Sequence, residues 1–347
     1  MSSNELTERE RRVLEAVIES YVATAEPAGS RTISRRFGLG VSPATIRNTM
    51  SDLEEKGFLF HPHTSAGRVP TNKAYRLYVD SLIRIEPLPS AERERLAEAI
   101  ASAGSTIEAI LRRTAQSLGV LTQELGVAVG PHFEQAVLRR LDLVRLASER
   151  LLMVLSLDGG DIRTIFVEVP AAIADDAVTE VARVLNERLG GLTLREIRTS
   201  LPTRLRDATA AGDVNDLLNI FVSGGTELFG AAAQPGTEVV LGQPSLLADQ
   251  PEFASGDRLR RLLELTETRG DLASLLRHRD TTSTGISITI GTEHGDPRLE
   301  PFTVVTAEYR AGGLTGVIGV LGPTRMPYEK VISIVSHASR LVSELLH

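Results

Sequence analysis

Two short segments near the start of the chain carry side chains suited to contacting bases and phosphates. In the first, Ser42 can cap a predicted helix over 44–56, and Pro43 fits the first helical position because its missing N–H is no loss there. The exposed face of that helix presents small, hydroxyl, amide and guanidinium groups: Ala44, Thr45, Arg47, Asn48 and Ser51. The second segment is a predicted turn between short strands at 58–62 and 69–71, and its contact groups are His63, Ser65, Gly67 and Arg68. We expect these residues and Ser42 to bind DNA, with Asn48 on a base, Arg47 on a base or phosphate, and Arg68 on the backbone or minor groove.

The surrounding sequence predicts the helices that must hold these groups. The third helix has an apolar stripe of Ile46, Met50 and Leu53, which would bury the face opposite the contact groups. Further helices are predicted at 7–23, 31–37 and 73–85, and prolines at 87 and 89 then mark a boundary. Helix, turn, basic helix and basic hairpin in this order predict a winged helix over residues 1–86. A winged helix that only contacts protein is the alternative, but that role does not require Arg, Asn and Thr at the start of the third helix.

Charge is unevenly distributed along the 347 residues. The whole chain has a formal net charge of −7, yet residues 30–76 hold eight Lys and Arg against three Asp and Glu. A basic face on an acidic body fits a DNA reader joined to a regulatory or dimerising body, whereas patchy surface charge is the simpler alternative. The sequence has no cysteine, no run of about 20 apolar residues that would span a membrane, and a polar N-terminus unlike a signal peptide. We therefore expect a cytoplasmic protein with no membrane partner.

The body of the chain changes from helical to strand periodicity and back. Residues 91–126 predict one or two helices, whose leucine spacing favours ordinary domain packing over a long coiled coil. Strands are predicted at 137–146, 151–157, 162–169, 286–290, 302–309 and 314–321. Helices are predicted at 175–189, 213–230, 257–278 and 328–346, and a long loop at 234–254. Early and late strands with helices between them predict an α+β, multidomain chain in which one antiparallel sheet domain is interrupted by a mostly helical insertion.

Other candidate sites are weaker. His61 and His63 share one side of a strand, but with no cysteine and no nearby acidic residue a solvated or phosphate-contacting pair is favoured over a metal site. The glycines at 316, 319 and 322 do not have the G-x-G-x-x-G spacing and follow no strand-to-helix turn, so we interpret them as structural. The sequence contains no P-loop, H-E-x-x-H or G-x-S-x-G motif. We expect no enzyme activity, no catalytic residue, no cofactor and no metal.

The chain resembles the HrcA family, the bacterial repressors of heat-shock chaperone operons. The resemblance covers nearly the whole length and rests on these segments: Leu6–Arg9, Glu26–Ser30, Ser42–Asn48, His63–Arg68, Pro70–Thr71 and Tyr309–Tyr328. One departure is the run Gly291-Thr292-Glu293-His294, where the family is expected to have Asn after Glu.

The resemblance implies a domain order, a DNA site and partners. It implies an N-terminal winged helix over 1–86, a GAF-like domain from 90–170 and 256–347, and an inserted dimerising domain over 171–255. It implies a homodimer that binds double-stranded DNA at an inverted-repeat operator called CIRCE, and a GroEL-type chaperonin that keeps the repressor active. Two alternatives stay open: a ligand-sensing winged-helix regulator with a small effector in the GAF-like domain, and an enzyme with a DNA-binding appendage.

Overall fold

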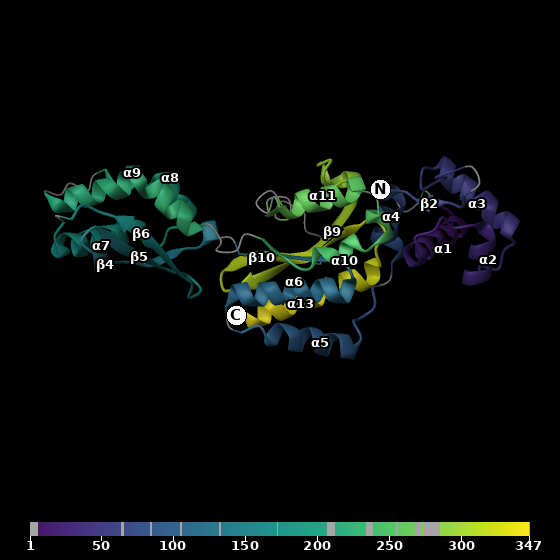
Figure 1. Ribbon diagram of the computed structural model, residues 1–347, viewed down its shortest axis with the longest axis horizontal. Coiled ribbons are helices and arrows are strands. Elements are labelled where there is room, and N and C mark those ends of the chain that lie inside the picture. Colours follow the sequence, from purple (N-terminus) through teal and green to yellow (C-terminus); the bar gives the residue numbers. More distant parts are fainter. Residues whose placement is uncertain are drawn as a thin grey trace. The chain divides into compact units, whose positions relative to one another are not determined.

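The computed structural model describes most of the chain as helices and small sheets. It covers residues 6–346 except 64–65, 84, 105, 132, 172, 207–211, 234–238, 255, 268–271, 274–275 and 277–284. The chain divides into two compact units (Figure 1). Unit 1 consists of Met1–Ala128, Val239–Glu308 and Ile318–Leu341, and unit 2 of Val129–Glu238, Tyr309–Val317 and Val342–His347. The expected mixed α+β class with antiparallel pairing is confirmed.

Unit 1 begins with helices and a short hairpin, in the order that the sequence predicts. The elements are α1 (Glu8–Thr24), α2 (Ser30–Phe37), α3 (Pro43–Glu55), β1 (Leu59–Phe60), β2 (Val69–Pro70) and α4 (Asn72–Leu77). A π-helical turn, Tyr78–Leu82, continues α4. Thr7 and Glu10 form the capping box at the start of α1. Strands β1 and β2 pair antiparallel but are shorter than predicted, because only two residues of each lie in register.

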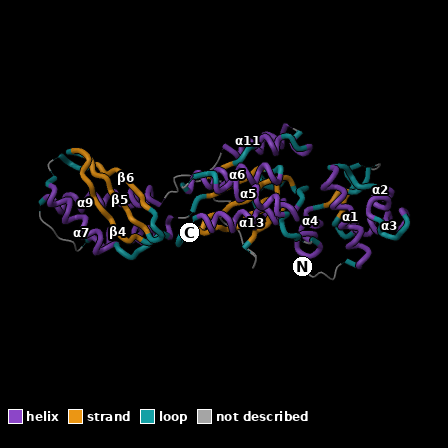
Figure 2. The backbone as a smooth tube through the Cα atoms, turned by 90° about the horizontal axis from the view of Figure 1, so that it is seen from below, coloured by secondary structure: helices purple, strands orange, loops and turns teal. Residues whose placement is uncertain are grey.

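The remainder of unit 1 is built on a five-stranded sheet that also includes residues from unit 2. The strands are β3 (Leu125–Val129), β7 (Val239–Leu241), β8 (Ile286–Ile290), β9 (Phe302–Ala311) and β10 (Leu314–Pro323), in the order β7-β3-β10-β9-β8. The associated helices are α5 (Ser90–Ala101), α6 (Ile107–Thr122) and α13 (Tyr328–Leu345), and Figures 1 and 2 show them on one side of the sheet. Helix α6 packs closely on β3, since a Cβ at Gly126 would lie 1.9 Å from the Ala115 carbonyl oxygen. The opposite side receives Phe253, which stacks on Phe302 of β9 with ring centroids 5.7 Å apart.

Unit 2 contains a second, smaller sheet with its own helices. The strands β4 (Leu138–Ala147), β5 (Arg150–Leu157) and β6 (Ile162–Glu168) form a three-stranded antiparallel sheet in that order. The helices are α7 (Asp175–Leu189), α8 (Leu194–Leu205) and α9 (Asp213–Ala233). Alternate residues of the strands, such as Leu141, Leu151 and Met153, join helix residues such as Val181 and Leu185 in one buried core. Figure 2 shows the other face of this sheet toward the viewer.

The strands are divided between the two sheets differently from what the sequence predicts. The strands at 137–169 were expected to pair with those at 286–321, but they form a separate sheet whose buried face is closed by α7, α8 and α9. The early partner of the late strands is β3, whose first two residues belong to the segment predicted to be helical and whose last three residues had no assignment. Unit 2, which contains the three-stranded sheet, begins at Val129.

Smaller elements also differ from the prediction. Helix α8 was not predicted, and the expected loop at 234–254 contains β7, α10 (Pro244–Ala248) and the 3₁₀ helix Pro251–Phe253. The predicted helix at 257–278 begins as α11 (Gly256–Glu267), and much of its remainder lies outside the described residues. Within the described part of the chain, no helix combines the length and apolar content needed to cross a membrane.

Candidate nucleic-acid interface

Helix α3 presents its N-terminal contact groups on a well-capped helix end. Ser42 Oγ accepts the backbone N–H of Thr45 over 3.1 Å and lies 3.0 Å from the Thr45 hydroxyl. Pro43 occupies the first turn, as the sequence predicts. Ile46, Met50 and Leu53 are buried. Because this apolar stripe faces the core, the opposite face of α3 is directed outward.

The outward face of α3 carries the residues that the sequence singles out for DNA. Ala44, Arg47, Asn48 and Ser51 are exposed, and Thr45 is half-buried. Arg47 and Asn48 lie in the first turns, where a recognition helix meets base edges. The structure thus leaves these groups accessible on the face of α3 opposite the buried stripe.

The β1–β2 hairpin is fastened to the segment after α1. Ala28 and Arg68 form an isolated antiparallel bridge, with N–H to carbonyl distances of 2.8 and 2.9 Å. A Cβ at Gly67 would lie 2.5 Å from the carbonyl carbon and oxygen of Ala28. Only glycine therefore allows this close approach. The hairpin is held beside the entry to α2, which explains why a glycine is placed at 67.

Arg68 is not an open cation on a hairpin tip. Its side chain is 13% exposed, and its Nη2 atom lies 3.0 Å from a carboxylate oxygen of Glu54. Glu54 also pairs with His61 Nδ1 over 2.7 Å. Glu54, in the last turn of α3, thus contacts both His61, which precedes the hairpin turn, and Arg68, which follows it. His63 is exposed and accessible to a ligand, whereas Ser65 lies outside the described residues.

The Glu54–His61 contact corrects one sequence argument. No acidic residue is near His61 in the sequence interpretation, but the fold places Glu54 against it because β1 turns back along α3. Among the residues that the structure describes, no group of three or more His, Asp and Glu side chains could hold a metal ion. His61 therefore joins Arg68 as a partner of the Glu54 carboxylate beside the hairpin.

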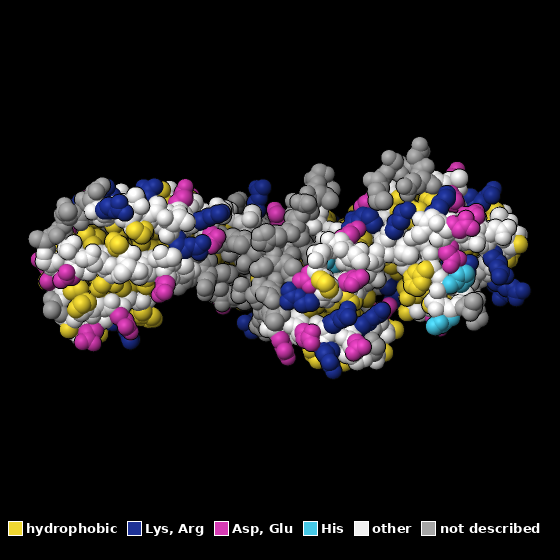
Figure 3. Space-filling model, turned by 90° about the horizontal axis from the view of Figure 1, so that it is seen from above, with side chains coloured by type: hydrophobic (Ala, Val, Ile, Leu, Met, Phe, Trp, Pro, Cys, Tyr) yellow, Lys and Arg dark blue, Asp and Glu magenta, His cyan; other side chains and the backbone are white. Residues whose placement is uncertain are grey.

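Helix α2 adds cations that sequence reasoning did not select as contacts. Arg31, Arg35 and Arg36 are exposed on this helix, which precedes α3 and packs against it. In Figure 3, Lys, Arg and His side chains are visible on the N-terminal region at the right of the view, interspersed with Asp and Glu. The local excess of positive charge in the sequence includes these three arginines of α2, but the charge count alone did not show which side chains face outward.

Comparison with known proteins identifies relatives over the full length. Residues 108–332 match the family model described as the HrcA protein C terminal domain. A heat-inducible transcription repressor HrcA from Chlorobium chlorochromatii is 38% identical over 100% of this chain and 99% of its own length. The protein of the same name from Geobacter sulfurreducens is 39% identical over 99% of this chain and 98% of its own.

A solved structure supports the fold alone. A crystal structure titled as a hypothetical protein at 2.2 Å resolution matches 99% of both chains with a TM-score of 0.57 and 21% identity. The match over most of the chain to the family model, together with full-length relatives near 38% identity, is sufficient to assign the family. The chain belongs to the HrcA family of heat-inducible transcription repressors, a class of regulators and not of enzymes.

Proposed function

We propose that this repressor binds an inverted-repeat operator, of the CIRCE type, as a homodimer that places one winged helix on each half-site. The main support for this proposal is the exposed N-terminal face of α3. Arg47 and Asn48 lie on this face, opposite the buried stripe. Residues 6–83 supply the winged helix, with α3 as its recognition helix and the β1–β2 hairpin as its wing. In this proposal Asn48 reads a base, Arg47 reads a base or a phosphate, and the arginines of α2 contact phosphates.

The role of Arg68 follows from its ion pair. In the free protein the guanidinium is held by Glu54, so contact with DNA requires it to share or leave that carboxylate. We propose that Arg68 and Gly67 chiefly orient the wing, which presents Ala66 and His63 to the backbone or minor groove. Other supports for a wing at this place are the bridge to Ala28 and the short strands on either side.

The test is selection of bound sequences from random DNA at a stated salt concentration, followed by Asn48→Ala. We expect an inverted repeat, and we expect Asn48→Ala to relax specificity at one position of each half-site by about 1–3 kcal/mol. Thr32→Ala, an exposed hydroxyl on α2 rather than on the recognition helix, is the matched control. If Asn48→Ala weakens binding to all sequences equally, Asn48 does not read a base.

The homodimer is proposed to form through the open face of the three-stranded sheet. Apolar side chains from all three strands point to this face: Val144, Leu146, Leu152, Val154, Ile162 and Phe166. Ile162 is 66% exposed and Phe166 63% exposed. Val144, Leu152 and Phe166 lie side by side across the sheet in the strand register. A contiguous apolar row of this kind is unusual on a monomer, and two copies related by a two-fold axis would cover it.

Chaperonin dependence is supported by the order of the strands. Strand β3 at 125–129 lies next to β10 at 314–323 in the sheet, so unit 1 cannot close until most of the chain has been made. Such non-local pairing is slow and exposes apolar surface during folding. We propose that a GroEL-type chaperonin assists this step, so that heat-damaged clients which occupy the chaperonin reduce active repressor. Refolding with and without chaperonin and ATP, scored by operator binding, tests it, and equal active fractions would refute it.

A groove in unit 1 favours a second candidate function, regulation by a small effector. It has a volume of about 1150 Å³ and is lined by apolar residues that include Ile286, Ile288 and Ile332, by the cations Arg93 and Arg340, and by acidic residues: Asp80, Glu86 and Glu293. The isoleucines and the two arginines suit an apolar molecule with an anionic end, although the acidic residues would disfavour an anion near them. Thermal unfolding in the presence of medium-chain carboxylates is the test, and an unchanged midpoint together with unchanged operator affinity would remove this candidate.

A further inference from the structure

The 3₁₀ helix Gly291–His294, which forms the turn after β8, contacts α4, the helix after the β1–β2 hairpin. Arg76 of α4 and Glu293 of the 3₁₀ helix Gly291–His294 are 217 residues apart in the sequence, yet both belong to unit 1. The run Gly291–His294 is also the segment in which this chain departs from the motif expected of its family. The DNA-binding proposal above assigns no DNA contact to Arg76 or Glu293, although Glu293 contacts residues 6–83 directly through Arg76.

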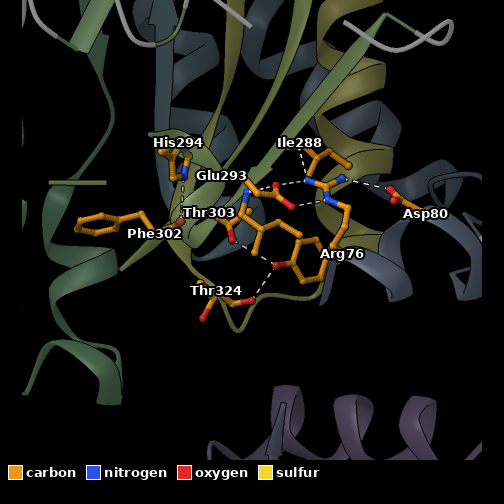
Figure 4. Close-up of polar contacts among 10 residues, drawn as sticks. Arg76, Asp80, Ile288, Glu293, His294, Phe302, Thr303 and Thr324 are labelled. Atoms are coloured by element: carbon orange, nitrogen blue, oxygen red, sulfur yellow. Dashed lines mark hydrogen bonds and ion pairs between the residues drawn. The ribbon is translucent and has the colours of Figure 1, made fainter. Parts of the chain in front are cut away.

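Arg76 holds both the turn and the edge strand β8 (Figure 4). Its Nε and Nη2 atoms donate to the two carboxylate oxygens of Glu293 over 2.8 and 2.5 Å, and Nη2 also donates to the Ile288 carbonyl over 2.7 Å. Glu293 in turn accepts the backbone N–H of Ile290 over 2.8 Å. A bidentate arginine–carboxylate pair fixes orientation as well as distance. Since the carboxylate is itself tied to β8, the pair joins α4 to the sheet and not merely to a surface loop.

A second contact lies one turn earlier on the same face of α4. A Cβ at Gly291 would lie 2.0 Å from Asn72 Nδ2 and 2.5 Å from Asn72 Cγ, so the glycine leaves the space that the amide fills. Gly291 also has φ +56°, a conformation that favours glycine. Asn72 and Arg76 are four residues apart and share one side of the helix. Gly291 and Glu293 of this turn therefore contact Asn72 and Arg76 on one face of α4.

A separate tie holds the other side of the N-terminal region. Arg325, which follows β10, donates through Nη1 to the Val22 carbonyl of α1 over 2.7 Å. The same guanidinium pairs with Glu252, with Nη2 at 3.0 Å from Oε2. Arg325 and Glu252 are 14% and 13% exposed, so this pair is largely screened from water. Two attachments at different helices restrain both the position and the rotation of the region that carries α3.

We propose that Glu293 is a positioning residue for DNA binding, which acts through Arg76 and sets the direction in which α3 is presented relative to the five-stranded sheet. The inference rests on the proposed DNA-binding function. A dimer that reads two half-sites needs its recognition helices at one separation and angle. Neither Arg76 nor Glu293 is among the predicted DNA contacts, so loss of the pair leaves each half-site contact intact and changes only the geometry between half-sites.

The first experiment measures that geometry without DNA. The chain has no cysteine, so spin labels can be attached at Thr32→Cys on α2 and Glu300→Cys in the body, both exposed sites. The labelled protein is mixed with an excess of unlabelled protein, so that in the proposed homodimer the two interacting labels lie within one protomer. We expect one narrow distance distribution in the labelled parent and a broader or displaced one after Glu293→Gln. Asp80→Asn is the matched control, because Asp80 also pairs with Arg76, over 3.1 Å, but lies on the same helical segment. An unchanged distribution after Glu293→Gln overturns the proposal.

The second experiment compares a selected inverted repeat with a single half-site. We expect Glu293→Gln to weaken binding to the inverted repeat by about tenfold and to alter half-site binding by less than about twofold, because only the linked binding depends on geometry. It should also flatten the preference for one half-site spacing, which a general loss of folded protein would not do. Arg76→Glu combined with Glu293→Arg should recover part of the spacing preference.

The outcomes separate the two proposals. Equal losses on both DNAs would show that Glu293 does not act through geometry. If the parent protein binds neither DNA, the proposed function fails, while the label distances still decide whether Glu293 positions the N-terminal region.

Discussion

In the five-stranded sheet, β9 and β10 are buried along most of their length, whereas in the three-stranded sheet β5 alternates between buried and accessible residues and β6 buries only Val167. Both sheets have helices on one side. The five-stranded sheet also receives Phe253 and neighbouring residues on its second side, but the second side of the smaller sheet keeps Ile162 and Phe166 mostly exposed. Unit 1 thus covers both sides of its sheet, while unit 2 leaves an apolar surface exposed, which the proposed homodimer would cover.

The largest expected effect of a substitution on the open face of the three-stranded sheet is loss of the proposed dimer. Phe166→Glu places a carboxylate on the open face, and we expect dimer dissociation to become easier by about 4 kcal/mol, roughly a thousandfold, since an aromatic contact is lost and a charge is buried. Sedimentation equilibrium measures it. Leu263→Glu is the matched control, because Leu263 is 50% exposed on α11 in unit 1. If Phe166→Glu stays as dimeric as the control, the open face is not the interface.

A smaller effect compares one isoleucine from each sheet. Ile318 of β10 is fully buried, whereas Ile162 of β6 is 66% exposed. With Phe166→Glu as the background, so that dimer formation does not contribute, Ile318→Ala should lower the free energy of unfolding by about 2–5 kcal/mol and Ile162→Ala by less than about 0.5 kcal/mol. Urea unfolding, followed by hydrogen exchange within each sheet, supplies the values. Similar losses at the two positions would mean that the open face is covered within the monomer.

The smallest effect concerns a carboxyl group that the covered sheet buries. Burial raises the pKa of Glu124 to about 8, although a hydrogen bond from Gln250 opposes the shift. Its folded pKa exceeds the ordinary value of 4.5, so the folded protein holds a proton that the unfolded chain has released between about pH 4.5 and 8. The stabilisation is therefore full below this window and is lost as the pH rises through it.

The expected size is on the order of 2 kcal/mol less stability at pH 7 than at pH 5 from this group. Glu124→Gln should flatten that dependence, and Glu108→Gln, at an exposed position on α6, should keep it. Urea unfolding midpoints of the parent and of both variants, measured at pH 5 and pH 7, test this pH dependence. A pH dependence that survives Glu124→Gln would assign the effect to other groups.

Sequence patterns predicted local elements well. The capping box at Thr7 and the Ser42 cap are confirmed because both depend on groups within four residues of each other. The bounds of α7 and β8 agree with the prediction, since each has a clear periodicity between breaks. Strand β3 was missed because it directly continues the apolar pattern of α6, and a short apolar run does not distinguish helix from strand.

The amino-acid sequence was sufficient to predict the helix order of the N-terminal region, the outward face of α3 and the family to which the chain belongs. These follow from short-range spacing and from motifs that need no partner. The folded chain was needed to show that Arg68 turns to Glu54, that Arg76 meets Glu293 across 217 residues, and that the early strands form their own sheet. Such contacts depend on which apolar faces close on one another, and alternation alone does not specify the partner of a buried face.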